Sequence, residues 1–253
     1  MLLRLDLYNT LAREDQQRGA ELRTGAIAAE LADGWDDAAA AAARRLLVGA
    51  QRRYQESWQA GAMYSPIAAA TDVSRACVSL VGADPDRMPA VRDAILAAGG
   101  YELSPVEGAG ELLERARSGG AQVCLVSDVH LTPGTGVLAF LRRCGVHDYF
   151  TAVSFSDRTG CYKPRPEAFL AAWTPAGYAD RPDQIVHVGD IHRNDVLGPT
   201  QLGVRAVRFA GVYDDRTAPD DGHPVVRRLL DVLVHLHGAA AGAGRAGDPD
   251  DAP

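Results

Sequence analysis

The sequence lacks the marks of a membrane, secreted or nucleic-acid-binding protein. No apolar run approaches the ~18 residues of a membrane-spanning helix. The N-terminus has no basic leader followed by a long apolar stretch, so we expect no signal peptide. The formal net charge of −7 argues against nucleic acid or an anionic membrane as a partner, because both favour a basic face.

Cysteine is scarce as well. The four cysteines are widely spaced and form no CxxC pair: Cys77, Cys124, Cys144 and Cys161. Together with the missing secretory signal, this predicts reduced thiols in a cytoplasmic protein. Cys124 lies within an apolar run, so we expect it to be a buried small hydrophobic residue.

What the chain contains is typical of a globular protein. Its 253 residues are 47% hydrophobic and 23% charged. Strands are expected at 1–8, 121–127, 151–155, 185–189 and 205–209, and helices at 107–118, 135–144, 164–173, 194–202 and 225–237. This alternation of strand and helix predicts an α/β fold with a parallel sheet and right-handed crossovers.

A helical region separates the first strand from the others. Breaks at Gly34, 61–66 and 82–85 divide residues 14–99 into about four helices. We therefore predict an α/β core of residues 1–12 and 101–237, interrupted by a helical insert of residues 13–100. The tail of residues 238–253 has almost no large apolar group, so we expect it to be disordered.

Polar side chains stand where apolar strands end, or shortly after. They are Asp6, Ser127, Lys163 and Asp190. Open α/β sheets bind ligands at the carboxyl ends of their strands, so these side chains are expected to converge there. Taken singly, each has a simpler explanation: Asp6 as a helix cap or surface acid, and Ser127 as a turn former.

Four short segments, in this order, resemble the motifs of the haloacid dehalogenase (HAD) superfamily of hydrolases. They are Asp6-Leu7-Tyr8-Asn9-Thr10, Ser127, Lys163-Pro164, and Gly189-Asp190 through to Asp195. The resemblance covers residues 1–12 and about 101–215. It implies a doubly wound, Rossmann-like parallel sheet with a helical cap domain inserted after the first motif. A cap that closes over the site implies a small-molecule substrate, because closure excludes water.

The resemblance gives each matched residue a role. Asp6 is the nucleophile that forms a covalent intermediate, which splits one difficult displacement into two easier steps. Thr10 and Ser127 hydrogen-bond the oxygens of a transferring phosphoryl group, although loop formation is a simpler explanation for both. Lys163 neutralises negative charge on the nucleophile and the substrate.

The fourth segment has the form found in phosphatases of the superfamily. Asp190 and Asp195 lie five residues apart across a strand-to-helix turn, where they can hold Mg²⁺ directly and through water. Asp6 and the backbone carbonyl of Tyr8 complete the expected metal site. The alternative is that Asp195 only caps a helix and that Asp190 is exposed.

Tyr8 departs from the phosphatase pattern, which has a second aspartate there as general acid. A tyrosine with its ordinary pKa of ~10 cannot replace that acid near neutrality. Tyrosine at this position resembles the 2-haloacid dehalogenases, whose aspartate attacks carbon without a metal. However, those enzymes carry an arginine where residues 35–38 are acidic, a small polar residue in place of Asp190, and a tyrosine in place of Phe169.

Three functions are compatible with this mixture of motifs. The leading hypothesis is a Mg²⁺-dependent phosphatase that acts on a small phosphorylated metabolite through an aspartyl-phosphate intermediate. The second is a metal-free 2-haloacid dehalogenase-type hydrolase that uses Asp6 and Tyr8. The third, from another class, is a catalytically weak binding or regulatory protein that keeps the fold.

Several histidines and arginines are further candidates for the site. His130 and His192 are candidates for the missing acid, because histidine titrates near neutrality. His187 is expected to be a satisfied residue within the sheet. Four arginines of the insert are expected to form a solvated helix face or to supply one clamp for an anionic substrate: Arg44, Arg45, Arg52 and Arg53.

Overall fold

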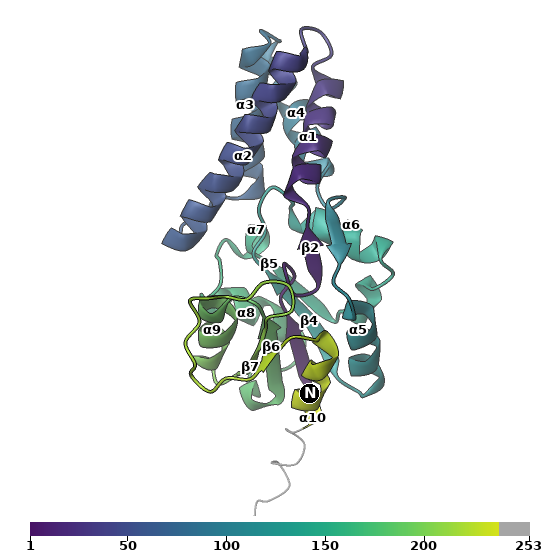
Figure 1. The fold of residues 1–253 in the computed structure, drawn as a ribbon, viewed down its shortest axis with the longest axis vertical. Helices are drawn as coiled ribbons and strands as arrows, with labels where there is room; N and C mark the ends of the chain where they lie inside the picture. Colours follow the sequence, from purple (N-terminus) through teal and green to yellow (C-terminus); the bar gives the residue numbers. More distant parts are fainter. Residues whose placement is uncertain (238–253) are drawn as a thin grey trace, which may run out of the picture.

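The computed structural model describes residues 1–237 and shows an α/β part with a group of helices stacked on it (Figure 1). The α/β part contains a six-stranded parallel sheet in the order β5-β4-β1-β6-β7-β8. In chain order these strands are β1 (Leu2–Leu5), β4 (Gln122–Ser127), β5 (Ala152–Phe155), β6 (Ile185–Gly189), β7 (Arg205–Phe209) and β8 (Val225–Val226). The disorder expected for 238–253 concerns residues outside the described range.

The first strand lies in the middle of the sheet because every one of its residues is buried. It pairs with β4 on one side and β6 on the other, so that Leu3 faces Val123 and Val186. It is shorter than the predicted 1–8, because the chain leaves the sheet after Leu5 and turns back, with the amide of Leu11 donating to the carbonyl of Leu7. This turn places Asp6 at the carboxyl end of the central strand.

Helices pack on both faces of the sheet, which confirms the predicted doubly wound α/β fold. One face is covered by α5 (Ala109–Ser118), α6 (Gly134–Arg143) and α10 (Val232–His237), and the other by α8 (Pro166–Trp173). Shorter helical segments are η2 (His147–Tyr149), α7 (Ser156–Thr159), η3 (Pro182–Gln184), α9 (Gly198–Thr200) and η5 (Leu229–Asp231). Each face thus has its own apolar core.

Two predicted helices were wrong in part. The segment 225–237 begins with strand β8, since Val225 and Val226 pair with β7, and becomes α-helical only at α10. The segment 194–202 is a π-helical turn, η4 (His192–Leu197), followed by the short α9. The amide of Gly198 donates to the carbonyl of Arg193, five residues back, and Pro199 has no amide with which to continue regular α-helical bonding.

The helices above the sheet form a bundle with a separate apolar core. They are α1 (Gln16–Glu30), α2 (Asp37–Ala60), α3 (Pro66–Leu80), the short η1 (Pro85–Arg87) and α4 (Met88–Ala97). The side chains of Asp15, Asp36 and Ser65 accept backbone hydrogen bonds at the starts of α1, α2 and α3, which explains where these helices begin. At the end of α2, Gly61 adopts the left-handed conformation that glycine tolerates best.

A short antiparallel ribbon joins the two parts of the molecule. It pairs β2 (Ala12–Glu14) with β3 (Leu103–Pro105), close to the ends of the predicted insert (Figure 1). Neither strand was predicted, because three residues are too few to show a periodic pattern. Within residues 1–237, no helix is both long enough and apolar enough to cross a membrane.

Candidate active site

The residues that the sequence analysis selected meet at the carboxyl edge of the sheet. A cavity of about 280 Å³ lies there, between the strand ends and α2. Five of the seven predicted residues line it: Asp6, Tyr8, Lys163, Asp190 and Asp195. The cavity is strongly acidic, because Glu14 and Asp128 also line it and Lys163 is the one lysine or arginine among its lining residues.

Lys163 is the centre of the charge arrangement. Its ammonium Nζ lies 2.5 Å from Oδ1 of Asp6 and 2.7 Å from Oδ1 of Asp195, and all three side chains are buried. Its backbone amide donates to Oδ1 of Asp128 at 3.0 Å. Burial opposes the positive charge, but Asp195 and Asp6 outweigh it and hold the pKa of Lys163 above its usual range. Lys163 is therefore a permanent cation beside Asp6.

Asp195 is fixed by a buried chain of hydrogen bonds that reaches through the sheet. His187 Nε2 lies 3.0 Å from Oδ1 of Asp195, and Nδ1 of the same ring accepts a hydrogen bond of 2.9 Å from Nε of Arg4. Burial and the nearby Arg4 lower the pKa of His187 to about 3, so the ring is neutral and donates its Nε2 proton to Asp195. His187 is satisfied within the sheet, as predicted, but its contact with the site was missed.

The turn after β6 brings Asp195 back against the strand. Its Oδ2 accepts a hydrogen bond of 3.1 Å from the amide of Ile191. A Cβ atom on Gly189 would collide with the Asp195 carboxylate, so only glycine fits there. Despite its burial, Lys163 and His187 hold the pKa of Asp195 well below its usual range. Asp195 is consequently ionised, and it does more than cap a helix.

The pKa values of Asp6 and Asp190 are raised, in contrast to that of Asp195, because for these two residues burial outweighs the nearby positive charge. Burial, opposed by Lys163, raises the pKa of Asp6 to about 7. Burial, followed by repulsion from Asp6 and Asp195, raises the pKa of Asp190 well above its usual range. Asp190 is buried and accepts a hydrogen bond of 3.0 Å from the Asn9 side chain, so it is not the exposed acid of the alternative explanation.

These three carboxylates are close enough to share one cation. Asp6, Asp190 and Asp195 each offer an oxygen, and these oxygens lie within 4.8 Å of one another. An all-oxygen donor set of this kind suits Mg²⁺. The residues present therefore fit the predicted metal.

The two predicted hydroxyl groups lie beside the cavity, not in its lining. Thr10 is fully buried, and its Oγ1 is 3.5 Å from Oδ2 of Asp6. Ser127 is also buried, and its hydroxyl donates to the carbonyl of Asp128 at 3.2 Å. Thr10 thus contacts the predicted nucleophile, whereas Ser127 points to the backbone.

Tyr8 lines the cavity with its ring packed against His130, at 4.9 Å between ring centroids. Its hydroxyl is buried and has no hydrogen-bond partner among the described residues. Burial, and then Glu14, raise the pKa of Tyr8 well above its usual range. The side chain is therefore a poor proton donor near neutrality.

The helical bundle supplies residues that the sequence analysis missed. From α2, the indole Nε1 of Trp58 donates to Oδ2 of Asp128 at 2.8 Å, and Tyr54 and Gln55 line the same cavity. Asp128 directly follows β4, as Asp6 follows β1, and this parallel in the sequence was a signal that could have identified it. Trp58 had no such signal, because its partner lies 70 positions away.

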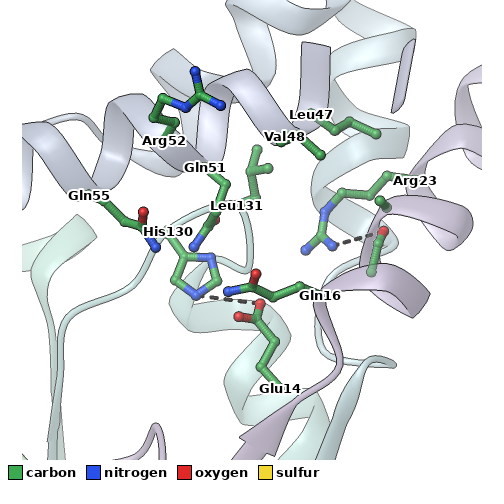
Figure 2. A pocket seen from close by; sticks show the side chains of 12 residues that line it. Glu14, Gln16, Arg23, Leu47, Val48, Gln51, Arg52, Gln55, His130 and Leu131 are labelled. Atoms are coloured by element: carbon green, nitrogen blue, oxygen red, sulfur yellow. Dashed lines mark hydrogen bonds and ion pairs between the residues drawn. The ribbon is translucent and has the colours of Figure 1, made fainter. Parts of the chain in front are cut away.

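A second cavity of about 260 Å³ adjoins the first, between α1, α2 and the loop after β4 (Figure 2). The two share Glu14, Gln16, Gln51, Gln55 and His130 among their lining residues. In Figure 2, His130 points toward Glu14, and its Nε2 lies 3.5 Å from a carboxylate oxygen of that residue. The shared lining makes the second cavity an extension of the first.

The arginines and histidines that the sequence offered as further site residues lie in different surroundings. Arg52 lines the second cavity, whereas Arg44 and Arg45 are exposed and Arg53 donates to the hydroxyl of Tyr64. His192 does not line the site cavity; its Nε2 faces Asp221 instead. Of the two histidines considered as a replacement acid, only His130 is in the cavity.

The fold and the site together define a class of protein: a doubly wound α/β protein with a buried aspartate–lysine centre at the carboxyl ends of its strands. A family model described as haloacid dehalogenase-like hydrolase matches residues 3–203. The chain belongs to this hydrolase family, which confirms the prediction from the four motifs.

Curated relatives match part of the chain. A glyceraldehyde 3-phosphate phosphatase from Methanopyrus kandleri is 34% identical over 103 residues, which are 38% of this chain and 43% of that protein. A pyrimidine 5'-nucleotidase from Escherichia coli is 33% identical over 103 residues, 40% of this chain and 43% of the relative. The chain thus spans less than half the length of the curated relatives it matches.

Solved structures match nearly the whole chain at low identity. A 2-haloacid dehalogenase from Pseudomonas syringae aligns with a TM-score of 0.66 and 21% identity over 94% of this chain and 98% of that one. A magnesium-bound HAD hydrolase from Bacillus subtilis aligns with a TM-score of 0.59 and 16% identity over 93% and 97% of the two chains. At these identities the likeness establishes the fold.

Proposed function

We propose that the protein is a Mg²⁺-dependent phosphatase that releases phosphate from a small metabolite through an aspartyl-phosphate intermediate. The observation that carries the proposal is the acidic cluster around Lys163. Five carboxylates line the cavity with one lysine, and three of them offer oxygens within 4.8 Å of one another. A cation would relieve the mutual repulsion of these carboxylates, and the oxygen donors suit Mg²⁺. The partial matches to a phosphatase and a nucleotidase support the same chemistry.

In this proposal the reaction has two displacements. An oxygen of Asp6 attacks phosphorus and a phosphoryl–Asp6 bond forms, while the bond to the leaving-group oxygen breaks; that oxygen keeps the electron pair and, where it is basic, takes a proton from water. Water then attacks the same phosphorus, phosphate leaves and the Asp6 carboxylate is restored. Lys163, 2.5 Å from Asp6, balances the charge of nucleophile and phosphoryl group. Held by Asp6, Asp190, Asp195 and the Tyr8 carbonyl, Mg²⁺ would neutralise phosphoryl oxygens.

The cavity walls support a small, polar substrate. Gln51 and Gln55 from α2 line both cavities, which have volumes of about 260 and 280 Å³. In this proposal residues 13–100 act as a cap, because Trp58 and Tyr54 cover the acidic cluster from above. We also propose a cytoplasmic location, which the four unpaired cysteines support.

Mg²⁺ binding should depend on Asp190. Titration of Mg²⁺ into the wild-type protein, followed by calorimetry and melting temperature, is expected to show one binding event that Asp190→Ala removes. The physical reason is that Asp190 is one of three buried carboxylates whose mutual repulsion the cation relieves. An Asp148→Ala variant, which removes an exposed acid that does not line the cavity, should bind normally. Full activity in excess chelator would contradict the metal-dependent proposal.

A 2-haloacid dehalogenase-type reaction is the second candidate, and Tyr8 is the observation that favours it. A screen that measures phosphate and halide release from small esters and 2-haloacids, with and without Mg²⁺, separates the two. Phosphate release that requires Mg²⁺ supports the phosphatase. Halide release without metal supports the dehalogenase, and stabilisation by ligands without any turnover supports a binding protein.

The Tyr8 side chain predicts a preference among phosphate esters. Since its raised pKa makes it a poor acid, the leaving group receives no proton from position 8. Acyl, enol and aryl phosphates should therefore be hydrolysed faster than alkyl phosphates. Tyr8→Asp is expected to raise the alkyl phosphatase rate by about 10²-fold, the lower end of the usual contribution of a general acid.

The matched control for this change is Tyr8→Asn, which removes the ring without adding an acid. A melt of both variants measures the cost of the lost ring. If the wild-type protein hydrolyses aryl and alkyl phosphates equally well, another residue already donates the proton. His130 is then the first to test, because it lines the cavity.

A further inference from the structure

A second group of metal-ligating side chains lies outside the active site. His192 belongs to the turn η4, and Asp221 and His223 belong to the loop between β7 and β8. One ligand atom from each residue lies within 4.8 Å of the others. None of the three lines the active-site cavity.

The two histidines face different oxygens of the Asp221 carboxylate. His192 Nε2 is 2.6 Å from Oδ2 of Asp221, and His223 Nδ1 is 2.8 Å from Oδ1. The second contact is not a well-formed hydrogen bond, because Nδ1 of His223 is buried and has no hydrogen-bond partner among the described residues. Two imidazole nitrogens thus face one carboxylate at ion-pair distance, and a metal cation can take the place of the protons that bridge such contacts.

The group lines a cavity of its own, with a volume of about 230 Å³. None of the residues that line this cavity also lines the active-site cavity, so the two sites do not share ligands. The volume leaves room for a water molecule as a fourth ligand. Arg208 also lines the cavity, but its charge is paired with Asp214 at 2.8 Å.

The backbone around the group is already held in place. The amide of His192 donates to Oδ2 of Asp215 at 3.0 Å, and the amide and hydroxyl of Thr217 donate to Oδ1 of the same residue. These bonds fix the loop against η4, and Asp215 is itself buried. A site that is ordered before the metal arrives binds it with a smaller loss of conformational entropy.

We propose that His192, Asp221 and His223 bind a Zn²⁺ ion that fastens the loop of residues 211–224 to the turn η4. Two imidazole nitrogens and one carboxylate oxygen suit Zn²⁺, whereas the three carboxylates of the active site suit Mg²⁺. The turn that would be fastened also carries Asn194 and Asp195, both of which line the active-site cavity. The proposal does not depend on which reaction the enzyme catalyses.

The test is a calorimetric titration of Zn²⁺ into the full chain in the presence of excess Mg²⁺. Wild type is expected to bind one equivalent tightly. His223→Ala and Asp221→Asn should each weaken this binding by more than about 100-fold, since loss of outer hydrogen-bond partners alone costs 10–100-fold. Binding of Co²⁺ in place of Zn²⁺ should give an absorption spectrum of a nitrogen-ligated ion that both variants lose.

Two control variants make the result specific. His147→Ala removes a partly exposed histidine whose ion-pair partner among residues 1–237 is Asp148, at 2.8 Å, and it should bind Zn²⁺ as wild type does. Asp190→Ala disrupts the active-site carboxylates and should also leave the Zn²⁺ equivalent intact. His223 lies in an exposed loop, and a melt of the metal-free variant checks that it folds.

Some outcomes would overturn the proposal. One is a wild-type protein that binds no Zn²⁺ when Mg²⁺ is in excess. Another is a Zn²⁺ equivalent that persists in both His223→Ala and Asp221→Asn. A third is an equivalent that disappears in Asp190→Ala, because the ion would then occupy the active-site carboxylates.

Discussion

Asp6→Asn is expected to lower the rate of turnover by about 10⁴-fold or more while the protein stays folded. Loss of the nucleophile removes the whole covalent route, and effects of this size follow removal of a group that acts as a unit with its neighbours. Asparagine has nearly the same shape, so the contact of the side chain with Lys163 is altered but no cavity forms. The measurements are steady-state rates with the best phosphate ester and a thermal melt.

Asp128→Asn is the matched control for this prediction. It removes the same charge from the same cavity, at the end of the neighbouring strand, without touching the nucleophile. After rapid quenching with substrate, mass spectrometry should find a phosphoryl group attached to wild type and to Asp128→Asn, but not to Asp6→Asn. Retention of more than a few per cent of the wild-type rate by Asp6→Asn would rule out the covalent mechanism.

Lys163→Gln should affect both activity and stability. Removal of its ammonium leaves Asp6 and Asp195 buried without their common partner, and breaking a buried ion pair from one side typically costs about 3–5 kcal/mol of the free energy of unfolding. Activity should fall by at least about 10²-fold, the size of effect seen when one electrostatic stabiliser is removed. Urea denaturation and steady-state rates measure the two effects.

The double variant Lys163→Gln/Asp195→Asn separates charge balance from chemistry. It removes one positive and one negative charge, so it should recover much of the lost stability and none of the activity. Mg²⁺ should also stabilise the single variant more than it stabilises wild type, because the cation would replace part of the missing charge. A single variant as stable as wild type would show that Lys163 is not needed to hold these carboxylates.

The central residues of the site were predictable because each has a local signature. Asp6 follows a run of buried residues in β1, and Asp190 follows a similar run in β6. In a parallel sheet, strand ends of this kind meet at one edge, so the convergence of Asp6 and Asp190 required no knowledge of tertiary contacts. Lys163 follows β5 only after the helix α7, so its place in the site rests on the family resemblance and not on a strand end. The helices α1 to α4 were equally visible, because caps such as Asp36 and breaks such as Gly61 are encoded locally.

Short or irregular elements were less predictable. The ribbon of β2 and β3 has three residues in each strand, and its pairing depends on the position of the helical bundle above it. Val225 and Val226 form the strand β8 by pairing with β7. The residue pattern of 225–237 does not show this pairing. In both places tertiary context overrides local propensity.

Residue spacing alone was enough to predict the five longer strands of the parallel sheet, the family, and which side chains stand at the strand ends, since these depend on residues near one another in the chain. Only the tertiary structure decided what those side chains touch. Arg4 meets His187 across 183 positions, and Trp58 meets Asp128 across 70. Such contacts arise when separate elements pack, and packing depends on three-dimensional fit that one-dimensional spacing does not carry.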